Sequence, residues 1–181
     1  MKKTILALGL GALAFGANAQ KSNAIKANIL SPIAKSGSFF YERKINDKMS
    51  GQLGVGFTAY NKSDVKFNGI FITPEFRYYL TGETMNGVYV GPFLRYQNLK
   101  IEDKSDMNNG EKSTLSTFGG GVVIGRQWTF GDIVTLDLFI GPSINTGKIK
   151  YEDNNGSNNT EVPGSLNGFG VRTGVTLGIA F

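Results

Sequence analysis

The chain contains neither cysteine nor histidine among its 181 residues. Without cysteine it forms no disulfide and has no thiol that could carry the lipid anchor of a lipoprotein. Without histidine it lacks the base on which most serine and cysteine nucleophile mechanisms depend, and the soft zinc ligands are missing as well. We therefore predict a protein that is not an enzyme, and we assign no catalytic, cofactor-binding or metal-binding residue.

The sequence also lacks an apolar run long enough for a membrane-spanning helix, which needs about 20 residues. Its apolar stretch from Ile5 to Phe15 is short, follows Lys2 and Lys3, and ends at Ala17-Asn18-Ala19. This is the pattern of a cleaved secretory signal peptide. We predict a signal peptide over residues 1–19 and one exported domain over residues 20–181.

Positive charge is in small excess and is not concentrated anywhere. The formal net charge is +5, and removing the two lysines of the predicted signal peptide lowers it to +3. Proteins that bind nucleic acids usually gather their basic residues on one face or helix. We expect no nucleic-acid partner.

What the chain does have is a strict two-residue alternation of apolar and polar or small side chains. Such alternation places the two sets on opposite faces of a β-sheet. The predicted strands are residues 24–34, 38–45, 51–60, 69–80, 88–101, 115–128, 133–150 and 169–181. An even number of strands lets an up-and-down sheet close, so the predicted fold is all-β, an eight-stranded antiparallel transmembrane β-barrel.

The connections between these runs alternate in length. Residues 46–48, 81–86 and 129–132 are short turns, whereas residues 61–68, 102–112 and 152–166 are longer and rich in Asn, Asp, Ser and Gly. In outer-membrane barrels the short turns face the periplasm and the long loops face the outside. We therefore expect both termini in the periplasm, with residues 35–37 as an unusually brief outer connection.

Two local features bear on strand geometry. The triplet Gly119-Gly120-Gly121 is a candidate β-bulge that would shift the alternation. The run VYVGP at residues 88–92 recurs as LFIGP at residues 138–142. Because proline cannot donate to a strand ladder, the repeat predicts two interruptions at similar heights in the barrel.

Alternation alone does not distinguish an apolar exterior in lipid from an apolar interior in water, as in a soluble lipocalin-like barrel. The glycines favour lipid, because a narrow lumen needs small residues beside large ones. The glycines that share the charged face are Gly54, Gly56, Gly91, Gly125, Gly141, Gly170, Gly174 and Gly178.

The apolar face carries aromatic residues that we predict to lie at the membrane interfaces, namely Tyr78, Tyr96 and Trp128. Arg126 shares this face, and we expect it to reach the lipid headgroups. Phe181 ends the same face in the final strand. We predict that Phe181 acts as the C-terminal signal read by the barrel-assembly machinery.

Six charged residues from five of the predicted strands fall on the opposite, inward face. They are Glu42, Glu75, Arg77, Arg95, Asp137 and Arg172. An unpaired charge in a closed lumen costs several kcal/mol. We predict that these three acids and three bases pair in a crossed network that plugs the lumen; the alternative is a selectivity ring lining a pore.

The runs PEFRYY at residues 74–79 and GVYVGPF at residues 87–93 carry a family resemblance. With the features above, the chain resembles the small outer-membrane β-barrel proteins of the OmpA-like and OmpX-like type. Within that group it is similar to an uncharacterised family of short barrels from Gram-negative bacteria. The resemblance implies the barrel and implies no activity.

These observations support a monomeric barrel in the outer membrane with a structural or adhesive role. Its expected partners are outer-membrane lipid, the barrel-assembly machinery during biogenesis, and an unidentified extracellular ligand at the loops. Two alternatives stay open: a narrow channel for small solutes or ions, and a secreted soluble barrel that binds an apolar ligand.

Overall fold

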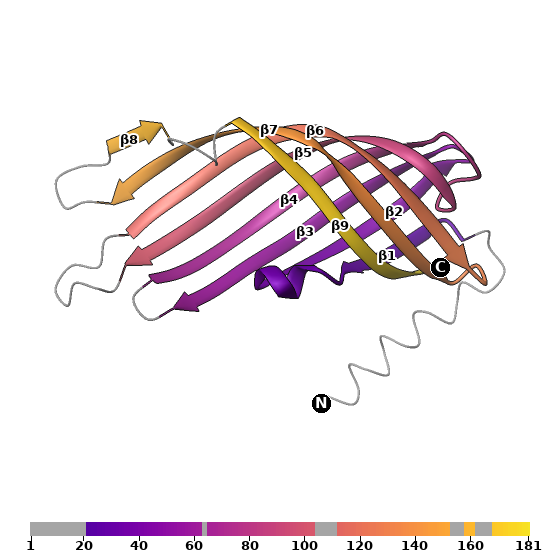
Figure 1. The fold of residues 1–181 in the computed structure, drawn as a ribbon, viewed down its shortest axis with the longest axis horizontal. Helices are drawn as coiled ribbons and strands as arrows, with labels where there is room; N and C mark the ends of the chain where they lie inside the picture. Colours follow the sequence, from indigo (N-terminus) through magenta and orange to yellow (C-terminus); the bar gives the residue numbers. More distant parts are fainter. Residues whose placement is uncertain (1–20, 63–64, 104–111, 153–157, 162–167) are drawn as a thin grey trace, which may run out of the picture.

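The computed structural model describes residues 21–62, 65–103, 112–152, 158–161 and 168–181, and its strands form a closed barrel (Figure 1). The predicted signal peptide over residues 1–19 lies outside the described residues. The described elements are β1 (Asn23–Asn28), the 3-10 helix η2 (Ser31–Ala34), β2 (Ser36–Asn46), β3 (Met49–Lys62), β4 (Val65–Tyr79), β5 (Gly87–Asp103), β6 (Lys112–Phe130), β7 (Val134–Glu152), β8 (Asn158–Glu161) and β9 (Gly168–Ala180). No helix among these residues has the length and apolar character needed to cross a membrane.

The barrel consists of eight strands, β1 to β7 and β9, and every neighbouring pair is antiparallel. The sheet closes because β9 pairs with β7 on one side and with β1 on the other. The predicted fold class is therefore confirmed. The short β8 lies within the predicted outer loop 152–166 and pairs with β7.

The first predicted strand, residues 24–34, is wrong in its second half. β1 ends at Asn28, and the chain then forms η2. Pro32 lies in the first turn of η2, where its missing N–H is not needed, and Lys35 ends the helix in a left-handed conformation with φ 50°. The first outer connection is therefore longer than the predicted residues 35–37.

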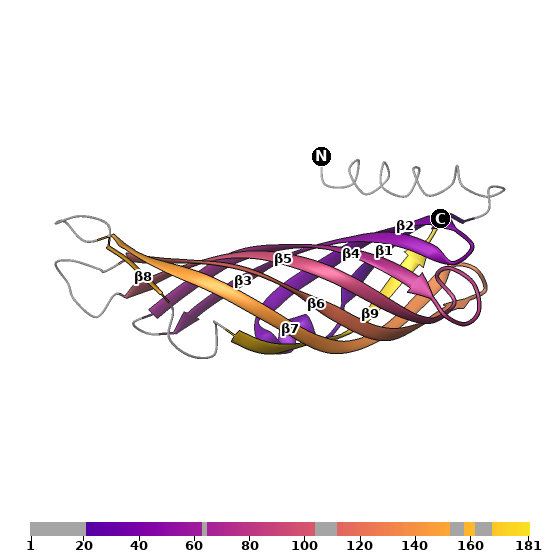
Figure 2. The ribbon, with the colours of Figure 1, turned by 90° about the horizontal axis from the view of Figure 1, so that it is seen from above.

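The predicted loop over residues 61–68 is also wrong. β3 continues to Lys62 and β4 begins at Val65, and their ladder pairs Asn61 with Lys66 and Ala59 with Asn68. Figure 2 shows β3 to β7 extending well beyond η2 toward the end that carries β8, whereas the C-terminus lies at the opposite end. The wall of the barrel is therefore taller on the β3–β7 side than at the β1–β2 hairpin.

The glycine triplet in β6 contains no bulge. The register is unbroken through Gly119, Gly120 and Gly121 against both neighbouring strands. A register shift occurs instead between Lys44 and Asn46, beside the turn from β2 to β3.

The two Gly-Pro pairs lie at the same height, as the repeat predicted. Pro92 in β5 pairs with Val122 in β6. On the other side of Val122, Pro142 occupies the level between the pairs Gly121–Ser143 and Ile124–Ile140. Both prolines point outward, so their missing N–H groups interrupt the ladders without placing a ring in the lumen.

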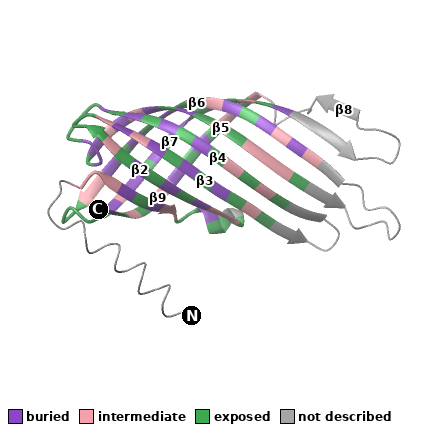
Figure 3. Ribbon diagram, turned by 180° about the vertical axis from the view of Figure 1, so that it is seen from behind, coloured by how far each residue is buried: buried purple, intermediate pink, exposed green. Residues whose placement is uncertain are grey.

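Burial alternates along the strands with the period that the sequence predicts (Figure 3). Inward-facing glycines stand directly opposite large side chains on neighbouring strands, where an added Cβ would collide with a ring. These pairs are Gly54 with Phe40, Gly56 with Phe71, Gly125 with Tyr89, and Gly174 with Phe139. The small residues therefore make room for the aromatic ones inside a narrow barrel.

Candidate functional site in the barrel lumen

A connected cluster of buried charged side chains crosses the lumen, and we call it the lumen ion network. It consists of Lys26, Glu42, Glu75, Arg77, Asp137 and Arg172. Five of these residues are among the six that the sequence points to. The six residues of the network come from β1, β2, β4, β7 and β9, which stand on different sides of the barrel.

The part of the network nearest the short turns joins two bases to two acids. The Lys26 ammonium lies 2.6 Å from Glu42 Oε2 and 3.3 Å from Asp137 Oδ2. Arg77 Nη1 lies 2.8 Å from the same Asp137 oxygen and 3.5 Å from Glu42 Oε2. All four side chains are fully buried. Each charge therefore has partners of opposite sign on two other strands.

Neutral groups complete the contacts of the two carboxylates. Tyr79 donates a hydrogen bond of 2.8 Å to Glu42 Oε1, and Ser50 donates a second one to the same oxygen. Tyr89 donates a hydrogen bond of 2.8 Å to Asp137 Oδ1. Buried carboxylates need several donors to offset the loss of water, and these hydroxyls supply them.

The middle of the network is built around Glu75. Arg77 Nε lies 2.6 Å from Glu75 Oε1, and Arg172 Nη1 pairs with Glu75 Oε2. The Arg172 guanidinium lies between two rings, 4.4 Å from the centroid of Phe93 and 4.7 Å from that of Phe139. Stacking on aromatic faces holds the plane of the guanidinium and leaves its edges to make polar contacts.

Arg95 stands apart from the network that the sequence predicts for it. Its Nε donates to Thr73 Oγ1 at 3.1 Å, and its guanidinium lies 5.0 Å from the Phe71 centroid. Arg95 makes no ion pair with any residue that the structure describes. Its face is the predicted one, but it forms an ion pair with none of the three carboxylates of the network.

Lys26 is the ion-network residue that sequence reasoning missed. The alternation of Ile25 and Ala27 with Lys26 already placed it on the inward face. It is 1 % exposed and brings a base from the first strand. A list of every charged residue that alternates with the apolar residues of its strand, including the first strand, would have contained Lys26.

The outer face of the barrel is apolar over a broad belt. Large hydrophobic side chains of every barrel strand are exposed there, including Val55, Leu94, Ile140 and Leu177. On β7 the outward apolar residues run from Val134 to Ile144. At about 3.3 Å per residue and a tilt of about 40° this stretch spans about 25 Å, which matches the apolar band of outer-membrane barrels.

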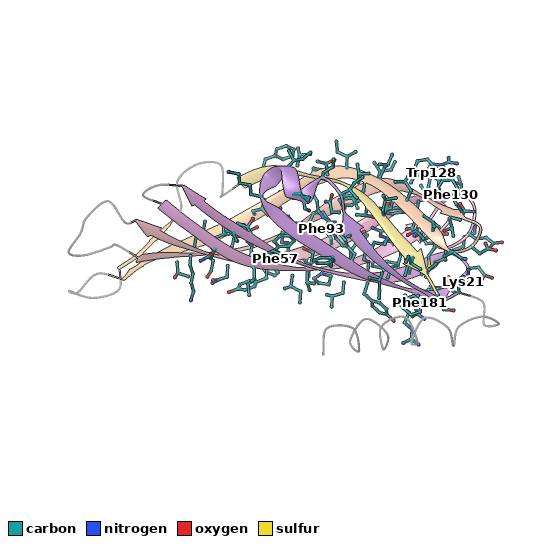
Figure 4. The ribbon with its side chains drawn as sticks, turned by 90° about the horizontal axis from the view of Figure 1, so that it is seen from below. Lys21, Phe57, Phe93, Trp128, Phe130 and Phe181 are labelled. Carbon is teal, nitrogen blue, oxygen red and sulfur yellow. The ribbon has the colours of Figure 1, made fainter. Side chains whose placement is uncertain are left out.

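Aromatic side chains lie at two levels of this belt (Figure 4). Three of them lie at the end with the short turns, namely Trp128, Phe130 and Phe181. Phe57 lies farther toward the end that carries β8. Tyr78 and Tyr96 are exposed on the same outer surface. Arg126 is also outward-facing, with its guanidinium 5.1 Å from the Trp128 centroid. The described positions agree with two interfacial girdles.

Phe181 lies at the seam between the first and last strands. Its N–H donates to Asn23 O at 2.8 Å, and Asn23 N–H donates to Phe181 O at 3.0 Å. These bonds extend the β1–β9 ladder by one residue beyond β9. Its role as an assembly signal stays a prediction.

The short turns carry few charged contacts. Lys44, near the end of β2, places its Nζ 2.8 Å from the carboxylate of Asp47 in the following turn, and this contact lowers the pKa of Asp47. Across the described ranges, no group of three or more acidic side chains could hold a metal ion. The lumen ion network therefore holds the main concentration of charge in the described barrel.

Sequence comparison places this chain in a family. Residues 4–161 match the family described as "Protein of unknown function (DUF3575)". The chain belongs to this family. A comparison with the curated proteins gave no significant match.

Solved structures share the fold. A major outer membrane protein from Thermus thermophilus is similar with a TM-score of 0.59 at 12% identity, over 88% of this chain and 98% of that one. The N-terminal β-barrel domain of Pseudomonas aeruginosa OprF is 13% identical with a TM-score of 0.45, over 90% of this chain and 98% of that one. The first of these confirms the fold of an eight-stranded outer-membrane barrel.

Proposed function

We propose that this DUF3575 protein is an integral outer-membrane barrel whose lumen is closed by side chains and whose role is structural or adhesive. The observation that carries the proposal is the lumen ion network. At the level of Lys26, Glu42, Arg77 and Asp137, every charged side chain is fully buried and in contact with another. A water-filled pore would leave such groups exposed, because ions pass along hydrated side chains.

The polarity of the two faces supports a membrane location. The outside carries the apolar belt and the inside carries the charges, which is the reverse of a soluble barrel that binds an apolar ligand. Transferring the belt into water would leave a contiguous apolar surface far larger than soluble monomers tolerate. We therefore propose an outer-membrane location; a monomeric state and periplasmic termini are further parts of this proposal.

The tall side of the barrel supports a role at the cell surface. Above Ile70 and Tyr96 the outward positions become polar at Asn68, Asn98 and Lys100. The strands themselves therefore continue beyond the apolar belt on this side of the barrel. An unidentified extracellular ligand would meet the protein at this end.

The conductance of the purified protein in a planar lipid bilayer tests the closed lumen. We expect no unit steps above the bilayer baseline in the wild-type protein. Steps that appear in the wild type and change in Arg95→Ala would contradict a closed lumen and support a narrow channel.

Protease treatment of intact Gram-negative cells tests the orientation. We expect cleavage confined to residues 102–112 and 152–166. Native protein recovered in the detergent-free soluble fraction would contradict the membrane location and support the secreted barrel.

A further inference from the structure

A small polar cavity lies in the lumen between the lumen ion network and the loop end of the barrel. Its volume is about 130 Å³. Phe93, labelled in Figure 4, contributes to its wall. The polar groups that line it are Arg95, Gln97, Thr117, Ser143, Asn145 and Arg172. They come from β5, β6, β7 and β9, so the cavity is built by several strands of the barrel wall.

The strand register brings these groups together. Arg95 on β5 pairs with Gly119 on β6, and Gly119 pairs with Asn145 on β7. A Cβ at Gly119 would collide with the Asn145 amide, so glycine leaves the space between Arg95 and Asn145 open. Ser143 pairs with Gly170, which likewise adds no side chain to the cavity.

Arg172 lines this cavity and has unpaired donors. Its side chain is 4 % exposed, and Nη1 is occupied by Glu75. Its Nε and Nη2 are buried and have no hydrogen-bond partner among the described residues. These two nitrogens form one edge of the guanidinium, which is the edge that binds two oxygens of one anion side by side. Buried donors of a charged group without partners are costly, so the edge calls for an acceptor.

The charges of the described lumen do not balance. Lys26, Arg77 and Arg172 contact the three carboxylates of the lumen ion network. Arg95 is the fourth base, and no described carboxylate contacts it. The surplus positive charge therefore lies at the cavity, beside the free edge of Arg172.

We propose that this cavity binds a small free oxyanion, with the chemistry of inorganic phosphate or sulfate. The Arg95 guanidinium binds the ion and neutralises its charge, the positive charge of Arg172 in the cavity wall adds to the attraction, and Thr117, Ser143 and Asn145 offer neutral donors. A water molecule occupies about 30 Å³ of liquid, so the cavity holds a few waters or one such ion. This inference goes beyond the proposed function and holds whether or not the lumen conducts.

Calorimetric titration of the full chain in detergent micelles tests the proposal. Sodium phosphate and sodium sulfate are titrated in a chloride buffer of constant ionic strength. We expect saturable binding of one ion per chain to the wild type. Losing one charged hydrogen-bonding partner weakens binding about tenfold or more, so Arg95→Gln should show this loss. Arg126→Gln, which removes an arginine from the outer face, should bind as the wild type does.

Arg95→Gln keeps the test informative because Arg95 makes no ion pair with a described residue, so the variant should fold. The slower migration of boiled protein on a detergent gel checks this. Absence of saturable binding by the wild type, or equal binding by Arg95→Gln, would overturn the proposal.

Glycerol phosphate distinguishes a free ion from the anionic group of a larger ligand. We expect it to bind no more tightly than inorganic phosphate if the cavity recognises the free ion alone. Tighter binding would overturn the assignment to a free ion and point to a larger molecule entering from the loop end.

Discussion

Arg172 and Glu75 pair across the full width of the barrel. Arg172 lies on β9 and Glu75 on β4, and three strands separate them in either direction around the sheet. The contact therefore ties opposite walls together, which neighbouring backbone ladders do not do. Because both groups are buried, removing Glu75 leaves Arg172 without a carboxylate partner among the described residues.

Replacing Glu75 with glutamine tests this link. Glu75→Gln leaves Arg172 and Arg77 without a shared carboxylate and should lower the free energy of unfolding by about 3 kcal/mol. The measurement is urea unfolding of the protein in lipid vesicles, followed by circular dichroism.

The double variant with Arg172→Met isolates the pair. Residues in contact show coupling energies of about 0.5–3 kcal/mol, so the double variant should lose less than the sum of the two single variants. Strict additivity would show that the two side chains do not stabilise each other in the membrane.

Asp137 is the acceptor shared by the other end of the network. Asp137→Asn removes the carboxylate that contacts Lys26, Arg77 and Tyr89. We expect a loss of about 3–5 kcal/mol in the same assay, because two buried bases lose a counter-charge. Glu83→Gln, in an exposed turn, is the matched control and should change stability by less than about 0.5 kcal/mol. Equal stability of the two variants would contradict the network.

The pairing of small and large residues inside the barrel gives a third prediction. A Cβ at Gly174 would collide with the Phe139 ring, so Gly174→Ala should cost about 1–3 kcal/mol. Adding Phe139→Leu should restore part of this loss because the smaller side chain leaves room for the methyl group. Gly51→Ala is the control, since its Cβ would meet nothing closer than 3.9 Å. A loss in the control as large as in Gly174→Ala would point to a backbone effect instead.

Depth in the membrane gives a fourth prediction. Ile140 lies near the centre of the apolar belt and Ile144 near its outer edge, and both point outward from β7. Ile140→Arg should cost about 2–4 kcal/mol and Ile144→Arg about 0–1 kcal/mol, because the penalty for arginine falls from the bilayer midplane toward the interface. Refolding yield and unfolding free energy in vesicles measure both. The reverse order would show that the belt is not aligned with the bilayer as proposed.

Much of this architecture follows from the sequence because a β-strand has a period of two. Parity alone assigns Glu42, Arg77 and Asp137 to the inside and Tyr96 to the outside. It also assigns the inward glycines, whose role is to leave room for rings. These features depend only on local geometry, so a single sequence contains them.

The sequence could not supply the height of each residue along the barrel axis or the register between neighbouring strands. Arg95 has the predicted face but forms no ion pair with a described carboxylate, and its level along the barrel depends on pairing across several strands. The polar composition of residues 61–68 suggested a loop, yet β3 and β4 continue to pair there, with Asn61 opposite Lys66. The end of β1 was not predicted because the alternation of apolar and polar residues continues in the sequence through Pro32, where the chain forms η2.

The β1–β9 seam has a consequence for how the barrel comes apart. β1 is 6 residues long, whereas the other barrel strands have 11 to 19. β1 pairs over only five residues with β9 and over five with β2, so the ladders on its two sides are the shortest in the barrel. Mechanical pulling on the chain near Asn23 should therefore detach β1 first and turn the closed cylinder into an open, curled sheet while the longer hairpins still hold.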